Sequence, residues 1–89
     1  MEQYYLDTRY DNRQSFYGKA IVAIEGNKRT LLSYMTPVCE IENGQVTLLS
    51  AWDYSPTTLR HVKEFLQQQG FKAYPKCEMT SHYPVNYER

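Results

Sequence analysis

One segment in the second half of the chain has apolar residues at the spacing of an α-helix. The apolar residues that recur at i, i+3, i+6 and i+7 are Leu59, Val62, Phe65 and Leu66. Ser55 suits the N-cap before them, and Pro56 suits the first helical position, where its missing N–H costs nothing. Gly70 suits the position just past the end, with Phe71 packing back on the last turn. The pattern predicts an amphipathic helix at about residues 56–69, with its apolar stripe against a core.

The polar residues of this segment are expected on the opposite, solvated face. They are Arg60, Lys63, Glu64, Gln67 and Gln68. Arg60 and Glu64 stand at i and i+4, which predicts a weak ion pair on that face. His61 lies at the flank of the apolar stripe, where we expect it to bond to a nearby strand or loop rather than to act as a base.

The segment before the helix has the pattern of a β-hairpin. Asn43-Gly44 is a strong turn signal, because both central residues of a type I′ turn need a positive φ. The turn predicts four opposed pairs: Glu42 with Gln45, Ile41 with Val46, Glu40 with Thr47, and Cys39 with Leu48. The apolar members of these pairs then share one face, which we expect to be the core face.

Two further strands are expected upstream. Residues 16–25 form a strand that a Gly-Asn pair follows, and residues 29–35 form the returning strand. Gly26 fits the first central position of a type II′ turn, which requires a positive φ. Pro37 cannot donate to a ladder, so we expect the chain either to bend or to reach a sheet edge there, before a third strand over residues 38–42.

The two ends of the chain show no clear period. Residues 1–15 are polar and rich in tyrosine, residues 71–74 suit one more short strand, and residues 76–89 are expected to be irregular. Together the patterns predict a single α+β domain over residues 1–89. In this domain an antiparallel β-meander of three to five strands packs against one amphipathic helix, and the two ends of the chain are peripheral.

Charge and composition narrow the range of partners. Ten Lys and Arg residues balance ten Asp and Glu residues, so the net charge is zero and binding to nucleic acid is not favoured. Two cysteines are too few for a disulfide-stapled secreted scaffold. No apolar stretch has the length of a signal peptide or a membrane span, so we expect a cytoplasmic protein outside the membrane. Nine tyrosines suit both strands and protein interfaces, and composition leaves both readings open.

The familiar motifs of catalysis and cofactor binding do not occur in the sequence. It has no glycine-rich phosphate loop, no Cys-x-x-Cys and no nucleophile elbow. The side chains that could ligate a metal are Cys39, Cys77, His61 and His82, and their spacings match no zinc pattern. We therefore expect a protein that is not an enzyme and has no cofactor or metal.

The predicted start of the helix gathers polar side chains at the positive end of the helix dipole. Thr57 and Thr58 place hydroxyls near free backbone N–H groups, a setting that can hold a phosphate or a carboxylate. Arg60 and His61 follow within one turn and would add positive charge. This cluster is a candidate anion site.

Three aromatic residues extend this candidate site. Trp52 and Tyr54 lie just upstream of the helix and offer a stacking surface, and Tyr34 lies at a strand end that could share the same rim. In the alternative reading, Ser55 simply caps the helix, Trp52 anchors the core, and Tyr34 completes a strand. The sequence alone leaves both readings open.

Two elements of the sequence resemble a known family. Residues 33–41 read SYMTPVCEI and resemble S-Y-x-T-x-V-x-E-I, and residues 55–66 read SPTTLRHVKEFL and resemble S-x-T-T-x-R-H-(I/V)-x-E-F. Together they resemble a family of small uncharacterised proteins of Firmicutes and of their phages and mobile elements, over residues 16–72. The resemblance implies a bacterial or phage accessory protein and assigns no role to any residue.

Small size, neutral charge and many tyrosines favour a non-enzymatic protein-binding module. With the resemblance, this becomes a phage or mobile-element protein that modulates a host or defence protein, in the manner of an anti-CRISPR inhibitor. Interfaces concentrate their binding energy in a few aromatic and arginine anchors, and the candidates are Trp52, Tyr54, Tyr34 and Arg60.

The alternative function is a small-ligand or nucleotide-binding domain built on the helix start. Thr57, Thr58, Arg60 and His61 would hold the anion, while Trp52 or Tyr54 would stack on a ring. A homodimer is also expected, because a domain of this size with an exposed strand edge gains stability by pairing.

Overall fold

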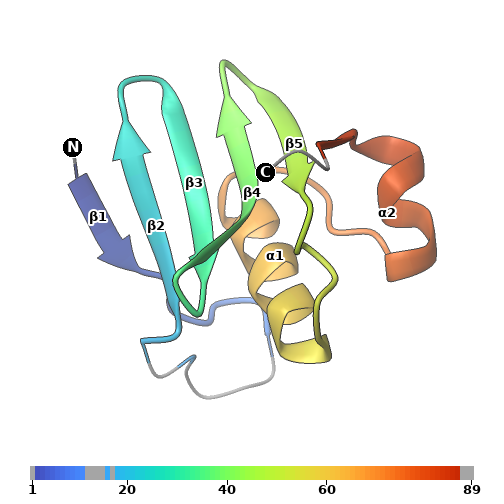
Figure 1. Ribbon diagram of the computed structural model, residues 1–89, viewed down its shortest axis with the longest axis horizontal. Coiled ribbons are helices and arrows are strands. Elements are labelled where there is room, and N and C mark those ends of the chain that lie inside the picture. Colours follow the sequence, from blue (N-terminus) through green and yellow to red (C-terminus); the bar gives the residue numbers. More distant parts are fainter. Residues whose placement is uncertain (1, 12–15, 17, 87–89) are drawn as a thin grey trace.

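Six strands and two helices make up the fold in the computed structural model, which describes residues 2–11, 16 and 18–86. The strands are β1 (Glu2–Tyr5), β2 (Ala20–Glu25), β3 (Lys28–Ser33), β4 (Thr36–Glu42), β5 (Gln45–Leu49) and β6 (Val85–Asn86), and the helices are α1 (Pro56–Gln68) and α2 (Lys76–His82). All six strands form one sheet in chain order, antiparallel except for the parallel pair β5–β6. The helix α1 packs on one face of this sheet and α2 lies beyond β5 (Figure 1). The predicted α+β fold with a meander on a helix is confirmed, with six strands instead of three to five.

The β4–β5 hairpin has the predicted turn and register. Asn43 and Gly44 both have positive φ, at 52° and 78°, as a type I′ turn requires. The four opposed pairs, from Glu42–Gln45 to Cys39–Leu48, are those that the turn predicts. Their apolar members are buried and belong to the core.

The β2–β3 hairpin also follows its turn signal. Gly26 has a φ of 62° and stands between the paired residues Glu25 and Lys28, as expected for a two-residue II′ turn. The strand β2 starts at Ala20 rather than at the predicted residue 16. Phe16 is buried in the core without belonging to a strand, and position 17 lies outside the described residues.

The β3–β4 connection differs from the prediction. The expected bend at Pro37 is wrong, because Pro37 lies inside β4 opposite Leu32, and the turn is formed by Tyr34 and Met35. Proline is tolerated there because the register shifts at a bulge between Leu31 and Leu32. No glycine or asparagine marks this turn, so its sequence carried no turn signal.

The helix α1 has the predicted start and end. Ser55 is the N-cap and Pro56 the first helical residue. Gly70 follows the C-cap with a φ of 88°, and the Phe71 N–H donates to the Leu66 carbonyl at 2.8 Å. These contacts form a Schellman motif, which closes the helix as expected.

The buried face of α1 is wider than the predicted apolar stripe. The buried side chains of the helix are Thr58, His61, Val62, Glu64, Phe65 and Leu66. Leu59 is only half-buried, so the stripe is confirmed for its other three members. The prediction of a solvated Glu64 is wrong, because this side chain is 1% exposed and its carboxylate accepts backbone hydrogen bonds.

Both ends of the chain contribute more than the predicted periphery. β1 joins the sheet, and Leu6 after it is 1% exposed and belongs to the core. Residues 71–74 form no strand, while residues 76–86, expected to be irregular, contain α2 and β6. Neither α2 nor β6 is long enough to show a regular spacing of apolar residues, so the sequence predicted neither element. No helix within the described part of the chain is long and apolar enough to cross a membrane.

Candidate binding site

A cavity of about 460 Å³ opens where the β3–β4 turn approaches the start of α1. Its lining residues are Ser33, Tyr34, Thr36, Val38, Ala51, Tyr54 and Thr58. All seven are uncharged, and the volume lies in the range of pockets that hold small molecules or single side chains. The structure therefore places Tyr34, Tyr54 and Thr58 of the candidate site residues around one cavity.

The floor of this cavity is a chain of hydrogen-bonded polar side chains. Ser55 Oγ lies 3.1 Å from Thr58 Oγ1 and also accepts the Thr58 N–H at 3.1 Å. Thr58 Oγ1 lies 3.3 Å from Ser33 Oγ, which lies 2.8 Å from His61 Nδ1. A hydroxyl both donates and accepts, so either tautomer of His61 fits this chain. The chain ties the first turn of α1 to the end of β3.

His61 lies beneath this floor rather than in the open cavity. Its side chain is 1% exposed, and its ring packs edge-on against Phe16, with the ring centroids 4.4 Å apart. The prediction that His61 bonds to a nearby strand is confirmed by the contact with Ser33. The sequence did not indicate this serine–histidine pair, because its two members lie far apart in the chain.

Exposed aromatic and apolar side chains lie at the rim of the cavity and on the β3–β4 turn beside it: Tyr34 and Tyr54 line the cavity, and Met35 follows Tyr34 in the turn. Tyr34 and Met35 are 52% and 71% exposed, and Tyr54 is 83% exposed. Tyr34 and Met35 have φ values of 51° and 67°, in the left-handed region that residues other than glycine rarely adopt. Such a conformation costs about 1–2 kcal/mol for each residue. We call these three residues the rim surface.

Three other predicted site residues lie away from the cavity. Trp52 is 3% exposed and belongs to the core, so it offers no stacking surface. Thr57 is half-buried and does not line the cavity. Arg60 bonds to Asp11 at 3.1 Å, and not to Glu64 as predicted. The structure therefore does not gather the positive charges of the predicted anion site.

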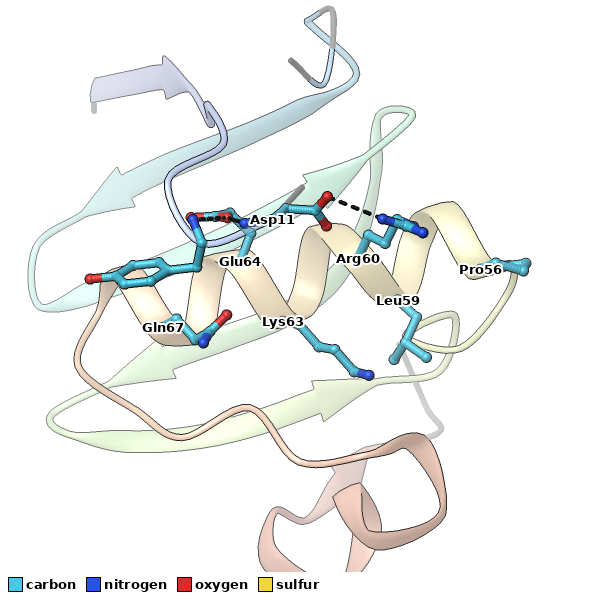
Figure 2. A pocket seen from close by; sticks show the side chains of 8 residues that line it. Asp11, Pro56, Leu59, Arg60, Lys63, Glu64 and Gln67 are labelled. Atoms are coloured by element: carbon cyan, nitrogen blue, oxygen red, sulfur yellow. Dashed lines mark hydrogen bonds and ion pairs between the residues drawn. The ribbon is translucent and has the colours of Figure 1, made fainter. Parts of the chain in front are cut away.

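A second hollow, of about 410 Å³, lies between α1 and the segment after β1 (Figure 2). One oxygen of the Glu64 carboxylate accepts the N–H groups of Tyr10 and Asp11, both at 2.9 Å. The Gln68 side chain donates to the other oxygen at 2.6 Å. Figure 2 shows Arg60 reaching the Asp11 carboxylate above the helix. These groups hold the N-terminal segment in place, so we assign this hollow a structural role.

The cysteines and histidines form no metal cluster in the described part of the chain. Cys39 is buried in the core, and burial raises the pKa of its thiol, with a smaller contribution from the Glu40 carboxylate. A thiol held protonated in this way is a poor nucleophile. Cys77 is exposed on α2.

Fold and site together define a small α+β protein with an uncharged, tyrosine-rimmed cavity. The chain belongs to a family of unknown function, DUF8033, whose model matches residues 4–81. The match includes both sequence elements that resemble a family and extends to β1 and α2. The expected membership of an uncharacterised family is thereby confirmed. No curated protein and no solved structure matches the chain significantly.

Proposed function

We propose that this chain is a small non-enzymatic protein-binding module that contacts its partner through the rim surface. The observation that carries the proposal is the β3–β4 turn, which holds Tyr34 and Met35 in left-handed conformations with their side chains in solvent. The fold gains little packing in return, because among the described residues Met35 makes no ring contact and Tyr34 contacts only the His61 ring, with the ring centroids 5.9 Å apart. Strain at exposed side chains is typical of functional positions.

The other I′-type hairpin of the same sheet supports this argument. At the β4–β5 turn the chain uses Asn43 and Gly44, the residues that adopt positive φ most easily. At the β3–β4 turn it uses Tyr34 and Met35 for backbone angles of the same sign. Tyrosine and methionine are enriched at protein interfaces, so binding accounts for a choice that folding disfavours.

The cavity beside the rim surface specifies the kind of group that the partner inserts. Its walls include Val38 and Ala51, and its floor carries the hydroxyls of Ser33 and Thr58. An uncharged lining would leave a charged side chain without a partner, which is costly in a desolvated site. We propose that a neutral side chain of the partner enters here as a central anchor.

The biological setting follows from the family resemblance. We propose a phage or mobile-element accessory protein that acts in the bacterial cytoplasm on a host or defence protein, as an anti-CRISPR-like inhibitor does. The pairing of Ser33 with His61 does not alter this proposal. His61 is buried and packs against Phe16, and Ser33 also bonds to Thr58, so we assign both side chains structural roles.

The test is affinity capture from a bacterial host lysate with wild-type protein and the variant Y34N/M35G. This variant removes two rim side chains and installs residues that suit the turn, so it should fold and lose the partner. The matched control is Gln67→Ala, an exposed position on the outer face of α1. The absence of any wild-type partner, or equal capture by all three proteins, would contradict the proposal.

The cavity also supports a second candidate function, the binding of a small ligand. The ligand would be neutral, because the candidate cation Arg60 is bonded to Asp11 and the cavity lining is uncharged. A panel of neutral metabolites should then raise the melting temperature of the wild type but not of Thr58→Val. No shift with any compound would remove this candidate and leave the protein-binding proposal untouched.

A further inference from the structure

The strand β1 forms an open edge of the sheet. Among the described strands it pairs with β2 alone, and Figure 1 shows it as the outermost strand on the side away from α2. All four residues of β1 are exposed, and its register with β2 runs without a bulge. Natural edge strands are protected from pairing by short length, charged side chains, proline or a bulge; β1 is short and carries Glu2 at its start, but it has no lysine, proline or bulge.

The hydrogen bonds of β1 determine which of its backbone groups face outward. The Leu6 N–H donates to the Ala20 carbonyl at 2.8 Å, so these two residues form a hydrogen-bonded pair. Hydrogen-bonded and non-hydrogen-bonded pairs alternate along antiparallel strands. Glu2 and Tyr4 therefore bond to β2, while Gln3 and Tyr5 direct their N–H and C=O groups away from the sheet.

We propose that β1 pairs antiparallel with β1 of a second copy of this chain, about a two-fold axis at Tyr4. In this register Gln3 of each copy lies opposite Tyr5 of the other, and every outward N–H and C=O group of both residues is bonded. A shift by two residues opposes Gln3 to Gln3 or Tyr5 to Tyr5. Either shift leaves half of these groups without a bond between the two strands.

The side chains favour a second copy as the occupant of this edge. Tyr4 meets Tyr4 of the second copy at a close, non-hydrogen-bonded pair, where aromatic pairs stabilise a sheet. Glu2, the only charged residue of β1, lies opposite Leu6 of the second copy, so like charges do not meet. On the other face, Tyr5 and Met35 help to line a hollow of about 210 Å³ beside the edge, within reach of Tyr5 of the second copy.

A disulfide experiment tests the register. In a Cys77→Ser background, Tyr4→Cys places the two thiols at the axis, where a cross-strand disulfide fits. Glu2→Cys is the matched control on the same face, because its thiols would lie about 13 Å apart along the strands. We expect a disulfide-linked dimer for Tyr4→Cys only. Equal cross-linking of both variants, or of neither, would overturn the proposed pairing.

A proline variant tests the use of the edge without a cross-link. Gln3→Pro removes an outward N–H that β2 does not use, so the fold should persist, as thermal unfolding can verify. Light scattering at roughly 1 mM should give the mass of two chains for the wild type and for Gln3→Ala, since so short an interface makes a weak dimer. Gln3→Pro should give the monomer mass of 10.6 kDa. A monomeric wild type, as expected if the edge takes a foreign strand instead, or a dimeric Gln3→Pro, would overturn the inference.

Discussion

Ser33 on β3 and His61 on α1 are joined by a contact of 2.8 Å between Ser33 Oγ and His61 Nδ1, although 28 residues separate them in the chain. Thr58 extends the contact to the first turn of the helix. The strand end that leads into the strained turn is therefore fixed to α1. This connection anchors Tyr34, the next residue after Ser33, at the position from which we propose that it contacts a partner.

Loss of the Ser33 hydroxyl should destabilise the fold. In Ser33→Ala, His61 Nδ1 loses its contact with the Ser33 hydroxyl and Thr58 loses one hydrogen bond, which should lower the free energy of unfolding by about 1–3 kcal/mol. Denaturant unfolding measures this loss. The control Ser81→Ala, at an exposed position of α2, should change stability by less than about 0.5 kcal/mol.

The same variant tests the proposal that the protein is not an enzyme. The wild type and Ser33→Ala should both fail to hydrolyse a neutral p-nitrophenyl ester above the buffer rate. Turnover by the wild type that Ser33→Ala abolishes would show that Ser33 is a nucleophile and His61 its base.

Removal of the Glu64 carboxylate should release the N-terminal segment. In Glu64→Ala the N–H groups of Tyr10 and Asp11 lose their acceptor, which should cost about 2–3 kcal/mol because that acceptor is charged and buried. Glu64→Gln keeps an acceptor oxygen and should cost less. Amide hydrogen exchange measures the effect directly. If the two amides stay protected in Glu64→Ala while the core is intact, the segment is held by other contacts.

The strained turn predicts a gain in stability. The variant Y34N/M35G should have a free energy of unfolding about 1–2 kcal/mol higher than that of the wild type, because both new residues suit positive φ. Denaturant unfolding measures this difference. The reverse exchange in the other hairpin, N43Y/G44M, should destabilise by a similar amount. A loss of stability in Y34N/M35G would show that Tyr34 and Met35 support the fold through contacts with other residues.

Stability should fall at high pH through Cys39. Burial raises the pKa of this thiol in the folded protein, so above roughly pH 8.5 the unfolded chain releases a proton that the folded protein keeps. The protonated Cys39 thiol therefore makes its full contribution to the free energy of unfolding below that pH. Above it, this contribution is lost at up to about 1.4 kcal/mol per pH unit. Unfolding between pH 7 and pH 10 should show a steeper loss for the wild type than for Cys39→Ala. The exposed thiol of Cys77 serves as the control, and Cys77→Ser should follow the wild type.

The elements that the sequence predicts well are those whose signals are local. Asn43-Gly44 specifies both a turn type and a register, and Ser55, Pro56 and Gly70 mark the ends of one helix, so these features match the structure. The turn at Tyr34 and Met35 has no such residues. Its geometry is imposed by the pairing of β3 with β4 and could not be inferred from local preference.

The candidate site was predictable only in part, because polar burial depends on contacts between distant segments. Thr58 and His61 Nδ1 are buried in contact with the Ser33 hydroxyl, and the buried Glu64 carboxylate accepts the backbone N–H groups of Tyr10 and Asp11. The spacing of apolar residues along one helix does not predict such contacts with distant segments. Trp52 shows the opposite case, in which a large ring near a candidate site belongs to the core.

The central claim is that the rim surface binds a partner and that its strain is retained for this purpose. The most direct measurement is the dissociation constant of the captured partner, determined by calorimetry for the wild type, Y34N/M35G and Gln67→Ala. We predict at least a tenfold weaker complex for Y34N/M35G, equal to about 1.4 kcal/mol, and unchanged affinity for Gln67→Ala. Equal affinity of Y34N/M35G and the wild type would contradict the claim.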